Sequence, residues 1–148
     1  MRTLALDVGT RTIGVAVSDE HGITANGLTT IKRREMKNDL DALSRIVDEY
    51  KPTEILIGIP YNIDGEISGR GKGILNFANI LKRTFSLHIE LWDESFSTVD
   101  AEKVLLEANL SRKKRKRVID KMAAVVILQN YLNNKGNVRP LDGADESE

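Results

Sequence analysis

The sequence predicts an α/β fold with a five-stranded mixed sheet, in which three antiparallel strands are extended by two parallel strands and flanked by helices. Two patterns indicate this fold class. The first part of the chain has short apolar segments joined by tight turns, as in an antiparallel meander. The following part alternates apolar runs with segments of helical periodicity, which is typical of parallel strands connected by helices. A chain of 148 residues fits one domain with a single core.

The three antiparallel strands are expected near the N-terminus. Strand-like apolar patterns cover residues 3–8, 12–18 and 23–31. The separating segments, Gly9–Thr10–Arg11 and Asp19–Glu20–His21–Gly22, contain residues that favour tight turns. Strands joined by such short connections pair with their neighbours in antiparallel order.

The two parallel strands are expected at residues 54–60 and 88–93, each after a predicted helix. The first helix opens at Asn38 or Asp39 and ends at a Lys-Pro pair. The second helix covers residues 72–85, where apolar side chains recur at helical spacing.

Two more helices are expected before the C-terminus. Ser97 or Thr98 is a suitable N-cap for a helix that closes at Asn109. The last helix begins at Ser111 and runs to about Leu132, with a basic first half and an apolar second half. The resulting order, βββαβαβα with one further helix, is the layout of the ribonuclease H fold, although fold analogy alone says little about chemistry.

The composition restricts the chemistry and the location of the protein. The chain has no cysteine, which excludes disulfides, thiolate zinc sites and a cysteine nucleophile. It has neither a signal-like N-terminus nor an apolar run long enough to span a bilayer. We therefore expect a cytoplasmic protein without a membrane partner, in which residues 1–134 form a ribonuclease H-like nuclease domain and residues 135–148 form a flexible acidic tail.

Three acidic positions are candidates for a metal site. Asp7 ends the first strand, Asp93 and Glu94 end the fifth, and Asp120 lies in the last helix. Residues beyond the carboxyl ends of neighbouring strands meet in a crevice, so Asp7 and Glu94 are expected to converge there. Three clustered carboxylates need a cation among them, and oxygen ligands of this kind suit Mg²⁺ or Mn²⁺. The alternative is structural, with Asp7 capping a turn and Asp93–Glu94 starting a loop.

Asp120 occurs at a helical spacing that favours contact with the sheet. Ala123, Ala124 and Ile127 follow it by three, four and seven residues and share its helix face. Small alanine side chains allow such a face to lie close to the strands. The alternative is a solvated Asp120 paired with a basic residue one turn earlier.

The net charge of zero hides a strongly basic segment. Residues 111–135 carry eight basic side chains and one acidic side chain. Such a local concentration favours phosphate contacts, whereas the alternative is a solvated helix end. Six consecutive residues are the expected nucleic-acid contacts: Arg112, Lys113, Lys114, Arg115, Lys116 and Arg117.

A glycine-rich loop over residues 60–73 precedes the second helix. Its backbone amides and Arg70 could hold a phosphate at the helix N-terminus, although a simple flexible connector is equally compatible with the pattern. The loop lacks the Gly-Lys-Ser/Thr ending of a Walker loop. Ser97 or Thr98 is expected to donate to a phosphate from its own helix N-terminus.

Four segments together resemble the YqgF family, also called RuvX, a family of pre-16S rRNA nucleases. They are residues 4–19, 58–71, 92–108 and 111–132, and the likeness covers nearly all of residues 1–132. The resemblance implies a ribonuclease H-like fold, a divalent-metal nuclease and a role in maturing the 5′ end of 16S ribosomal RNA. It also implies the metal-ligand roles of Asp7, Glu94 and Asp120, with Asp93 as a supporting residue.

The sequence departs from related patterns at two places. The family usually has an arginine where this chain has Ser95, so a phosphate contact there is not expected. Junction resolvases of the RuvC group place an acid at the end of the fourth strand, where this chain has Gly58–Ile59–Pro60. Precursor 16S rRNA is therefore favoured over branched DNA as the partner of a monomer or homodimer. The alternatives are a Holliday-junction resolvase and a non-catalytic binder of structured nucleic acid, whereas an actin-like kinase would need a second domain.

Overall fold

The computed structural model describes residues 1–60, 69–93 and 112–134, and for residues 112–121 it describes the backbone alone. Five strands form one sheet: β1 Thr3–Val8, β2 Thr12–Ser18, β3 Ala25–Lys32, β4 Glu54–Ile59 and β5 His88–Asp93. Their order across the sheet is β3-β2-β1-β4-β5. β1 is antiparallel to β2 and parallel to β4, and β5 is parallel to β4. The predicted five-stranded mixed sheet is therefore confirmed.

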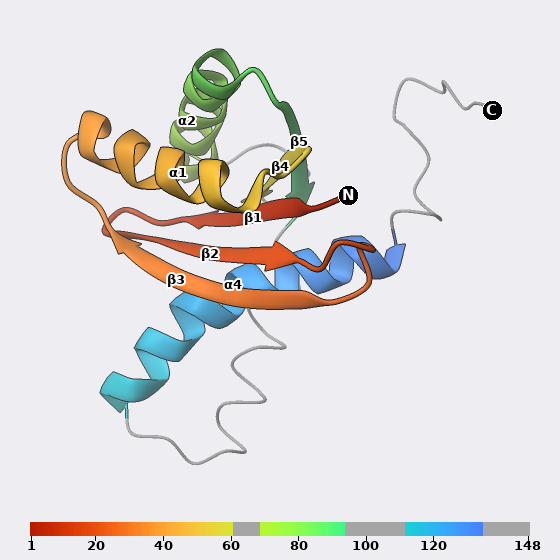
Figure 1. The fold of residues 1–148 in the computed structure, drawn as a ribbon. Helices are drawn as coiled ribbons and strands as arrows, with labels where there is room; N and C mark the ends of the chain where they lie inside the picture. Colours follow the sequence, from red (N-terminus) through yellow and green to blue (C-terminus); the bar gives the residue numbers. More distant parts are fainter. Residues whose placement is uncertain (61–68, 94–111, 135–148) are drawn as a thin grey trace.

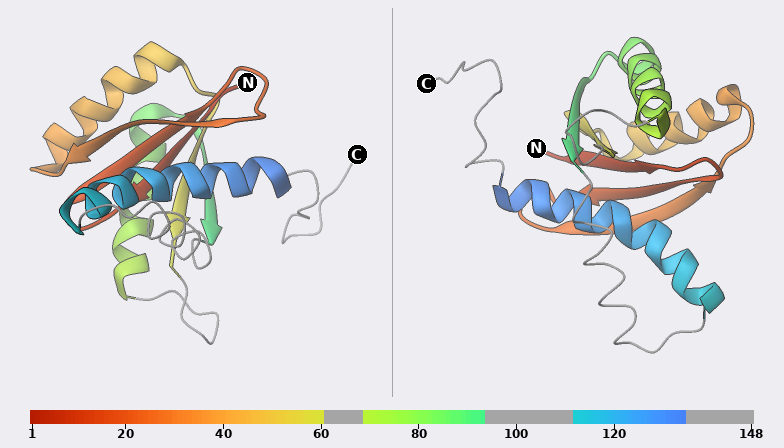
Figure 2. Two further views of the ribbon diagram at one scale, coloured as in Figure 1. Left: turned by 90° about the horizontal axis from the view of Figure 1, so that it is seen from below. Right: turned by 180° about the vertical axis from the view of Figure 1, so that it is seen from behind.

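Within the described residues, three helices cover the sheet. They are α1 Met36–Tyr50, α2 Gly69–Phe85 and α4 Arg112–Asn134. Figure 1 and Figure 2 show α1 and α2 on one face and α4 on the other, so the sheet is the middle of three layers. The predicted helix at residues 97–109 and the predicted tail at residues 135–148 lie outside the described residues.

The predicted starts of three elements were wrong. α1 begins at Met36 and not at Asn38 or Asp39, and Glu35 is its N-cap without a side-chain cap. α2 begins at Gly69, because the helix continues through glycines that are typical of a loop. β3 begins at Ala25, because the preceding two residues donate their backbone N–H groups to the Asp19 carboxylate and belong to the turn.

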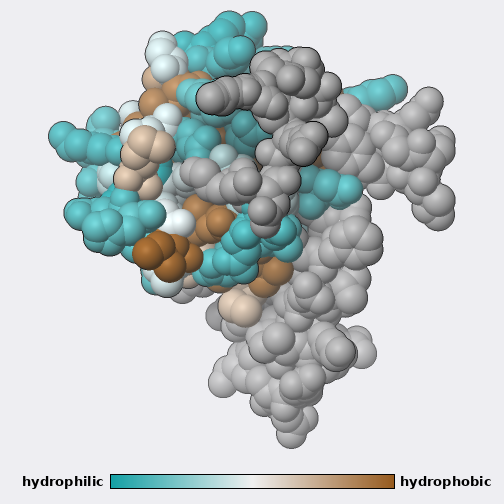
Figure 3. Space-filling view, turned by 90° about the vertical axis from the view of Figure 1, so that its right-hand side faces the viewer, coloured by the Kyte–Doolittle hydropathy of each residue, from teal (hydrophilic) through white to brown (hydrophobic). Residues whose placement is uncertain are grey.

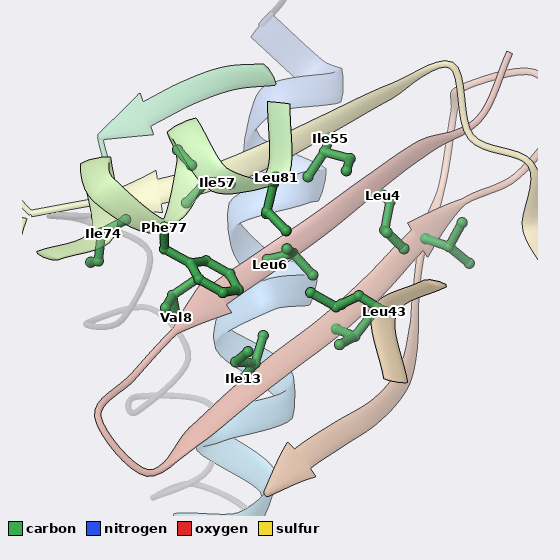
Figure 4. Packing of buried hydrophobic residues seen from close by; sticks show 13 residues of the cluster. Leu4, Leu6, Val8, Ile13, Leu43, Ile55, Ile57, Ile74, Phe77 and Leu81 are labelled. Atoms are coloured by element: carbon green, nitrogen blue, oxygen red, sulfur yellow. The ribbon is translucent and has the colours of Figure 1, made fainter. Parts of the chain in front are cut away.

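The face beneath α1 and α2 is a closed apolar core. Figure 4 shows large side chains of β1, β2 and β4 packed against both helices. The fully buried members include Leu4, Leu6, Leu43, Phe77 and Leu81. This burial removes a large apolar area from water and is the main stabilising contribution to the fold.

The face beneath α4 has smaller side chains and more polar contacts. Ala5 and Ala16 are fully buried there against Ala124, Ile127 and other residues of α4. The predicted burial of the alanine face of the last helix is thereby confirmed. The small strand residues let the helix lie close to the backbone of the sheet.

Hydrogen bonds fix the C-terminal half of α4. The Tyr131 hydroxyl and the Thr3 hydroxyl both donate to Oε2 of Glu54, at 3.0 and 2.9 Å. Burial and the Glu54 carboxylate raise the pKa of Tyr131 well above its ordinary value, so it remains a donor. The Trp92 indole N–H donates to Asn130 at 2.9 Å, and the ring packs edge-to-face on Tyr131 at 5.2 Å between centroids. Packing against the α4 side of the core and this hydrogen bond therefore account for Trp92.

The described surface offers little apolar area. Figure 3 shows one face on which most described residues are hydrophilic and the hydrophobic ones form small separate groups. The exposed large hydrophobic residues of the described part are Met1, Ile23 and Met36. None of the described helices is long and apolar enough to cross a membrane.

Candidate nuclease site

Asp7 lies near the end of the central strand and on the α4 face. Strand alternation places it on the same face as Ala5, which packs against α4. Its cross-strand partner on β2 is Gly14, which has no side chain. Asp7 is half-buried. A carboxylate is thus held by the middle of the sheet, and the neighbouring strand leaves space beside it.

The backbone of α4 brings Asp120 toward the same end of the sheet. Tyr131 and Thr3 share the Glu54 carboxylate, which gives α4 and β1 a common anchor. Asp120 is eleven residues before Tyr131, about 16 Å along a helix. Asp7 is four residues beyond Thr3, about 13 Å along a strand. Figure 1 and Figure 2 show the N-terminal end of α4 and the β1–β2 turn at the same end of the molecule.

The helix face that carries Asp120 is the face turned to the sheet. Ala124 and Ile127, four and seven residues later, are fully buried against the strands. The position of Asp120 is therefore consistent with the predicted convergence on Asp7, while its side chain is not described. Glu94 lies outside the described residues. No group of three or more acidic or histidine side chains suited to a metal ion occurs within the part of the chain that the structure describes.

Asp93 lies on the opposite face of the sheet from Asp7. It is paired with Ile59, and the preceding Trp92 packs into the α4 side of the core. Because side chains alternate along a strand, Asp93 is directed away from α4. The sequence alone did not show on which face of the sheet Asp93 lies.

The turn between β1 and β2 is held by backbone and side-chain hydrogen bonds. The Gly9 N–H donates to the Thr12 carbonyl at 2.8 Å, and a Cβ at Gly9 would lie 3.0 Å from that oxygen. The Arg33 guanidinium donates to the Gly9 carbonyl at 2.8 Å. The backbone N–H of Arg33 donates to the Arg11 carbonyl at 2.8 Å. Arg33, which directly follows β3, therefore holds the end of the strand that carries Asp7.

Arg33 is itself held by a buried acid. Its Nε lies 3.3 Å from Oδ2 of Asp39, whose side chain is 1% exposed. The other carboxylate oxygen of Asp39 accepts the backbone N–H of Arg34 at 3.0 Å. The guanidinium also lies over the Phe77 ring at 5.2 Å from its centroid. The sequence analysis missed Arg33, since no local pattern links a basic residue at a strand end to a carboxylate in the next helix.

Two hollows flank the β1–β2 turn and have different linings. The first, of about 430 Å³, lies between the turn and α2. The second, of about 630 Å³, lies between the turn and the ends of β2 and β3. Gly9, Thr10 and Arg70 line both.

The second hollow has a cationic wall. Arg11, Lys32 and Arg70 line it together with three threonines, and none of its described lining residues is acidic. The predicted phosphate contact Arg70 is therefore close to two basic residues that the sequence analysis did not select. Ser97 and Thr98 lie outside the described residues. The basic run 112–117 forms the first turns of α4, at the same end of the molecule as the β1–β2 turn (Figure 2).

Solved structures share this architecture. A Thermus thermophilus RuvC in complex with a Holliday junction superposes with a TM-score of 0.59 at 13% identity, covering 95% of this chain and 99% of the other. A Fowlpox virus resolvase bound to Holliday junction DNA gives a TM-score of 0.60 at 12% identity, covering 91% and 99% of the two chains. These similarities show the fold, which is ribonuclease H-like.

Relatives of known sequence are much more similar. A protein of Thermoanaerobacter pseudethanolicus is 50% identical over 138 residues, covering 93% of this chain and 99% of the relative. A protein of Geobacillus sp. is 52% identical over 137 residues, covering 91% and 99%. Both are named "Putative pre-16S rRNA nuclease". With the fold, this similarity defines the class of the protein as a ribonuclease H-like nuclease.

The family model described as "RuvX: Holliday junction resolvase" matches residues 1–134. The chain therefore belongs to the RuvX family.

Proposed function

We propose that the protein is a cytoplasmic endonuclease that matures the 5′ end of precursor 16S rRNA in a reaction dependent on Mg²⁺ or Mn²⁺. The observation that carries the proposal is the half-buried carboxylate of Asp7 at the end of the central strand, beside Gly14 and beneath α4. The substrate is supported by the names of relatives that are about half identical to this chain.

The residues fit a hard divalent cation. Asp7, Glu94 and Asp120 would supply oxygen ligands only, and the glycine opposite Asp7 leaves space for an ion. The register of β5 favours Glu94 over Asp93 as the ligand from this strand, because Asp93 is on the other face. A supporting role for Asp93 stays a prediction.

The bound metal would activate a water for attack on phosphorus and would neutralise charge on the leaving oxygen. The chain's own residues would hold the substrate. Arg70 and the basic run 112–117 would contact phosphates on both sides of Asp7, and Ser97 or Thr98 would donate to a phosphate. Arg33, which donates to the Gly9 carbonyl, would keep the end of β1 in place during the reaction.

The test compares wild type with Asp7→Asn on precursor 16S RNA and on a four-way DNA junction, in Mn²⁺ and in EDTA. We expect wild type to cleave the RNA in Mn²⁺ only, and Asp7→Asn to lose about 10³-fold or more of the rate. Asp41→Asn is the matched control, since Asp41 is an exposed carboxylate on α1. Equal cleavage by Asp7→Asn would refute the metal site.

Junction resolution is the second candidate function. It is favoured by the description of the family model and by resolvases of the same fold. Metal-dependent cleavage of the DNA junction, with no cleavage of the RNA, would select it. Binding that persists in EDTA and in Asp7→Asn, with no cleavage of either substrate by wild type, would instead select a non-catalytic nucleic-acid-binding protein.

A further inference from the structure

The strand residues that line the second hollow lie on the face of the sheet that carries Asp7. They are Thr12 of β2 and Thr30 and Lys32 of β3. Thr12 pairs with Lys32, and the isoleucines that adjoin them pack into the core under α1 and α2. Because side chains alternate along a strand, Thr12, Thr30 and Lys32 are directed to the opposite face. These lining residues and the candidate metal ligand are therefore on one side of the sheet.

One row of paired residues connects this lining with Asp7. Asp7 pairs with Gly14 on β2, and Gly14 pairs with Thr30 on β3. The Cα atoms of Asp7 and Thr30 are therefore about 10 Å apart, since neighbouring strands are spaced by about 4.8 Å. Gly14 places no side chain between them. The hollow thus lies close to Asp7, within reach of a nucleic-acid strand bound there.

Arg11 and Lys32 bring positive charge to this hollow. Both residues are exposed. Among the described residues, neither side chain forms an ion pair or a hydrogen bond. Arg33, the residue after Lys32, is by contrast held by Asp39. Two uncompensated cations in a hollow without a described acidic lining residue favour an anionic ligand.

The opposite end of the same face has the opposite charge. Glu54 and Glu90 alternate with residues that pack against α4, so both lie on the face of Asp7. Both carboxylates also raise the pKa of Tyr131. The face is therefore polarised along its strands, and a polyanion is attracted to the end that carries Asp7.

The chemistry of the lining suits phosphate groups. Arginine, lysine and threonine side chains donate to phosphate oxygens, and the described lining consists of these residue types and one glycine. It has no aromatic or large apolar residue on which a base could stack. A nucleic-acid strand would therefore present its backbone to this hollow.

We infer that Arg11 and Lys32, together with the Thr30 hydroxyl, bind backbone phosphates of the substrate strand next to the bond that is cleaved at Asp7. This inference deepens the proposed function and rests on it. Such contacts position the strand and carry no sequence information. They also require a substrate that continues beyond the cleaved bond toward β3, so the cut falls within a strand.

The test measures the affinity of Asp7→Asn protein for RNA by fluorescence anisotropy in Mg²⁺ at several salt concentrations, so that cleavage does not interfere. Arg11→Gln and Lys32→Gln are added together to this background. The matched control combines Lys82→Gln with Arg83→Gln, which removes the same charge from exposed residues in the last turn of α2 that line neither hollow. The probes are a precursor 16S RNA fragment across the mature 5′ end and an RNA of equal length and altered sequence.

Loss of both cations should weaken the binding of both RNAs about tenfold or more at about 0.1 M salt. The slope of log affinity against log salt should become shallower by about 0.7–0.9 for each lost contact, because fewer counterions are released. Arg11→Lys with Lys32→Arg should keep the slope, since the charge is retained. The control should bind like its parent protein, and urea unfolding of each variant checks that the fold is retained.

A slope for the Arg11→Gln, Lys32→Gln variant that equals the slope of the control would overturn the inference. An affinity loss confined to one of the two RNA sequences would also overturn it, because phosphate contacts do not distinguish bases. Either result leaves the proposed function intact provided that wild type still cleaves precursor RNA in Mn²⁺. Absence of cleavage by wild type, with a shallower slope in the Arg11→Gln, Lys32→Gln variant, would refute the proposed function and leave the phosphate contacts supported.

Discussion

The two faces of the sheet are built from the same strands but have different roles. Two consecutive residues of β1 show this difference. Leu6 is fully buried among the large side chains under α1 and α2, and Asp7, the next residue, lies half-buried under α4 beside a glycine. The α1 and α2 face is closed by apolar packing, whereas the α4 face has alanines, shared carboxylate hydrogen bonds and the candidate site. Large apolar side chains dominate the first face, whereas the second face combines apolar packing with polar contacts and carries Asp7.

The largest expected effects distinguish the two neighbouring residues Leu6 and Asp7, one on each face of the sheet. Leu6→Ala should lower the free energy of unfolding by about 2–5 kcal/mol, because it leaves a cavity in a packed core. Asp7→Asn should change the stability little and remove the cleavage activity. Urea titration and a cleavage assay on both variants test this separation. A large stability loss in Asp7→Asn would show that this carboxylate is part of the structural framework.

Arg33 connects the β1–β2 turn to α1 through Gly9 and Asp39, and its removal gives the second effect. Arg33→Met should cost about 2–3 kcal/mol of unfolding free energy, because the buried Asp39 carboxylate loses its charged partner and the Gly9 carbonyl loses a donor. Thermal and urea unfolding measure the loss. Adding Asp39→Asn should recover part of it, since the uncompensated buried charge is removed. No recovery in the double variant would contradict the role of the ion pair.

The third effect concerns the polar contacts under α4. Tyr131→Phe should lower the unfolding free energy by about 1 kcal/mol, because one hydrogen bond is lost while Glu54 keeps its contact with Thr3. The edge-to-face packing on Trp92 is retained by phenylalanine. Urea unfolding is the measurement, with Tyr50→Phe as the control of the same chemistry on α1. A loss as large as that of Leu6→Ala would show that α4 depends on polar anchoring more than on burial.

The sequence predicted the strands of the sheet better than the start of α2. β1, β2 and β5 were predicted at their observed bounds, because alternation of apolar residues fixes both the strand and its register. The start of α2 was missed, because Gly69 and Gly73 resemble a loop in sequence and are helical in the structure. Helical propensity disfavours glycine, so the local pattern does not predict that the helix begins at Gly69.

The same limit applies to the candidate site. Asp7 could be selected from sequence, because an acid at the end of an apolar strand is a local pattern. The contact of Arg33 with Gly9 and Asp39 could not, because it joins a strand end, a turn and a helix that become neighbours only in the folded chain. The face on which Asp93 lies could not be selected either, because it follows from the place of β5 in the folded sheet. Interactions between elements, and not the elements themselves, are what the sequence leaves undetermined.

The smallest expected effect is at the turn between β2 and β3. Backbone N–H groups of Thr24 and Ile23 donate to the Asp19 carboxylate and lower the pKa of this side chain below its ordinary value. Because the pKa is lower in the folded state, the stabilisation is present above the unfolded pKa and is lost as the pH falls through the folded pKa. Asp19→Asn should therefore be slightly less stable than wild type at neutral pH and equally stable once the pH has fallen below the folded pKa of Asp19.

Thermal unfolding of both proteins across this pH range tests the prediction. A stability difference that is constant at all pH values would show that the amide geometry of the turn matters and the charge does not. A difference that disappears in acid would show that the turn is stabilised by an ionised carboxylate. This turn would then depend on charge, in contrast to the core under α1 and α2, which is held mainly by apolar burial.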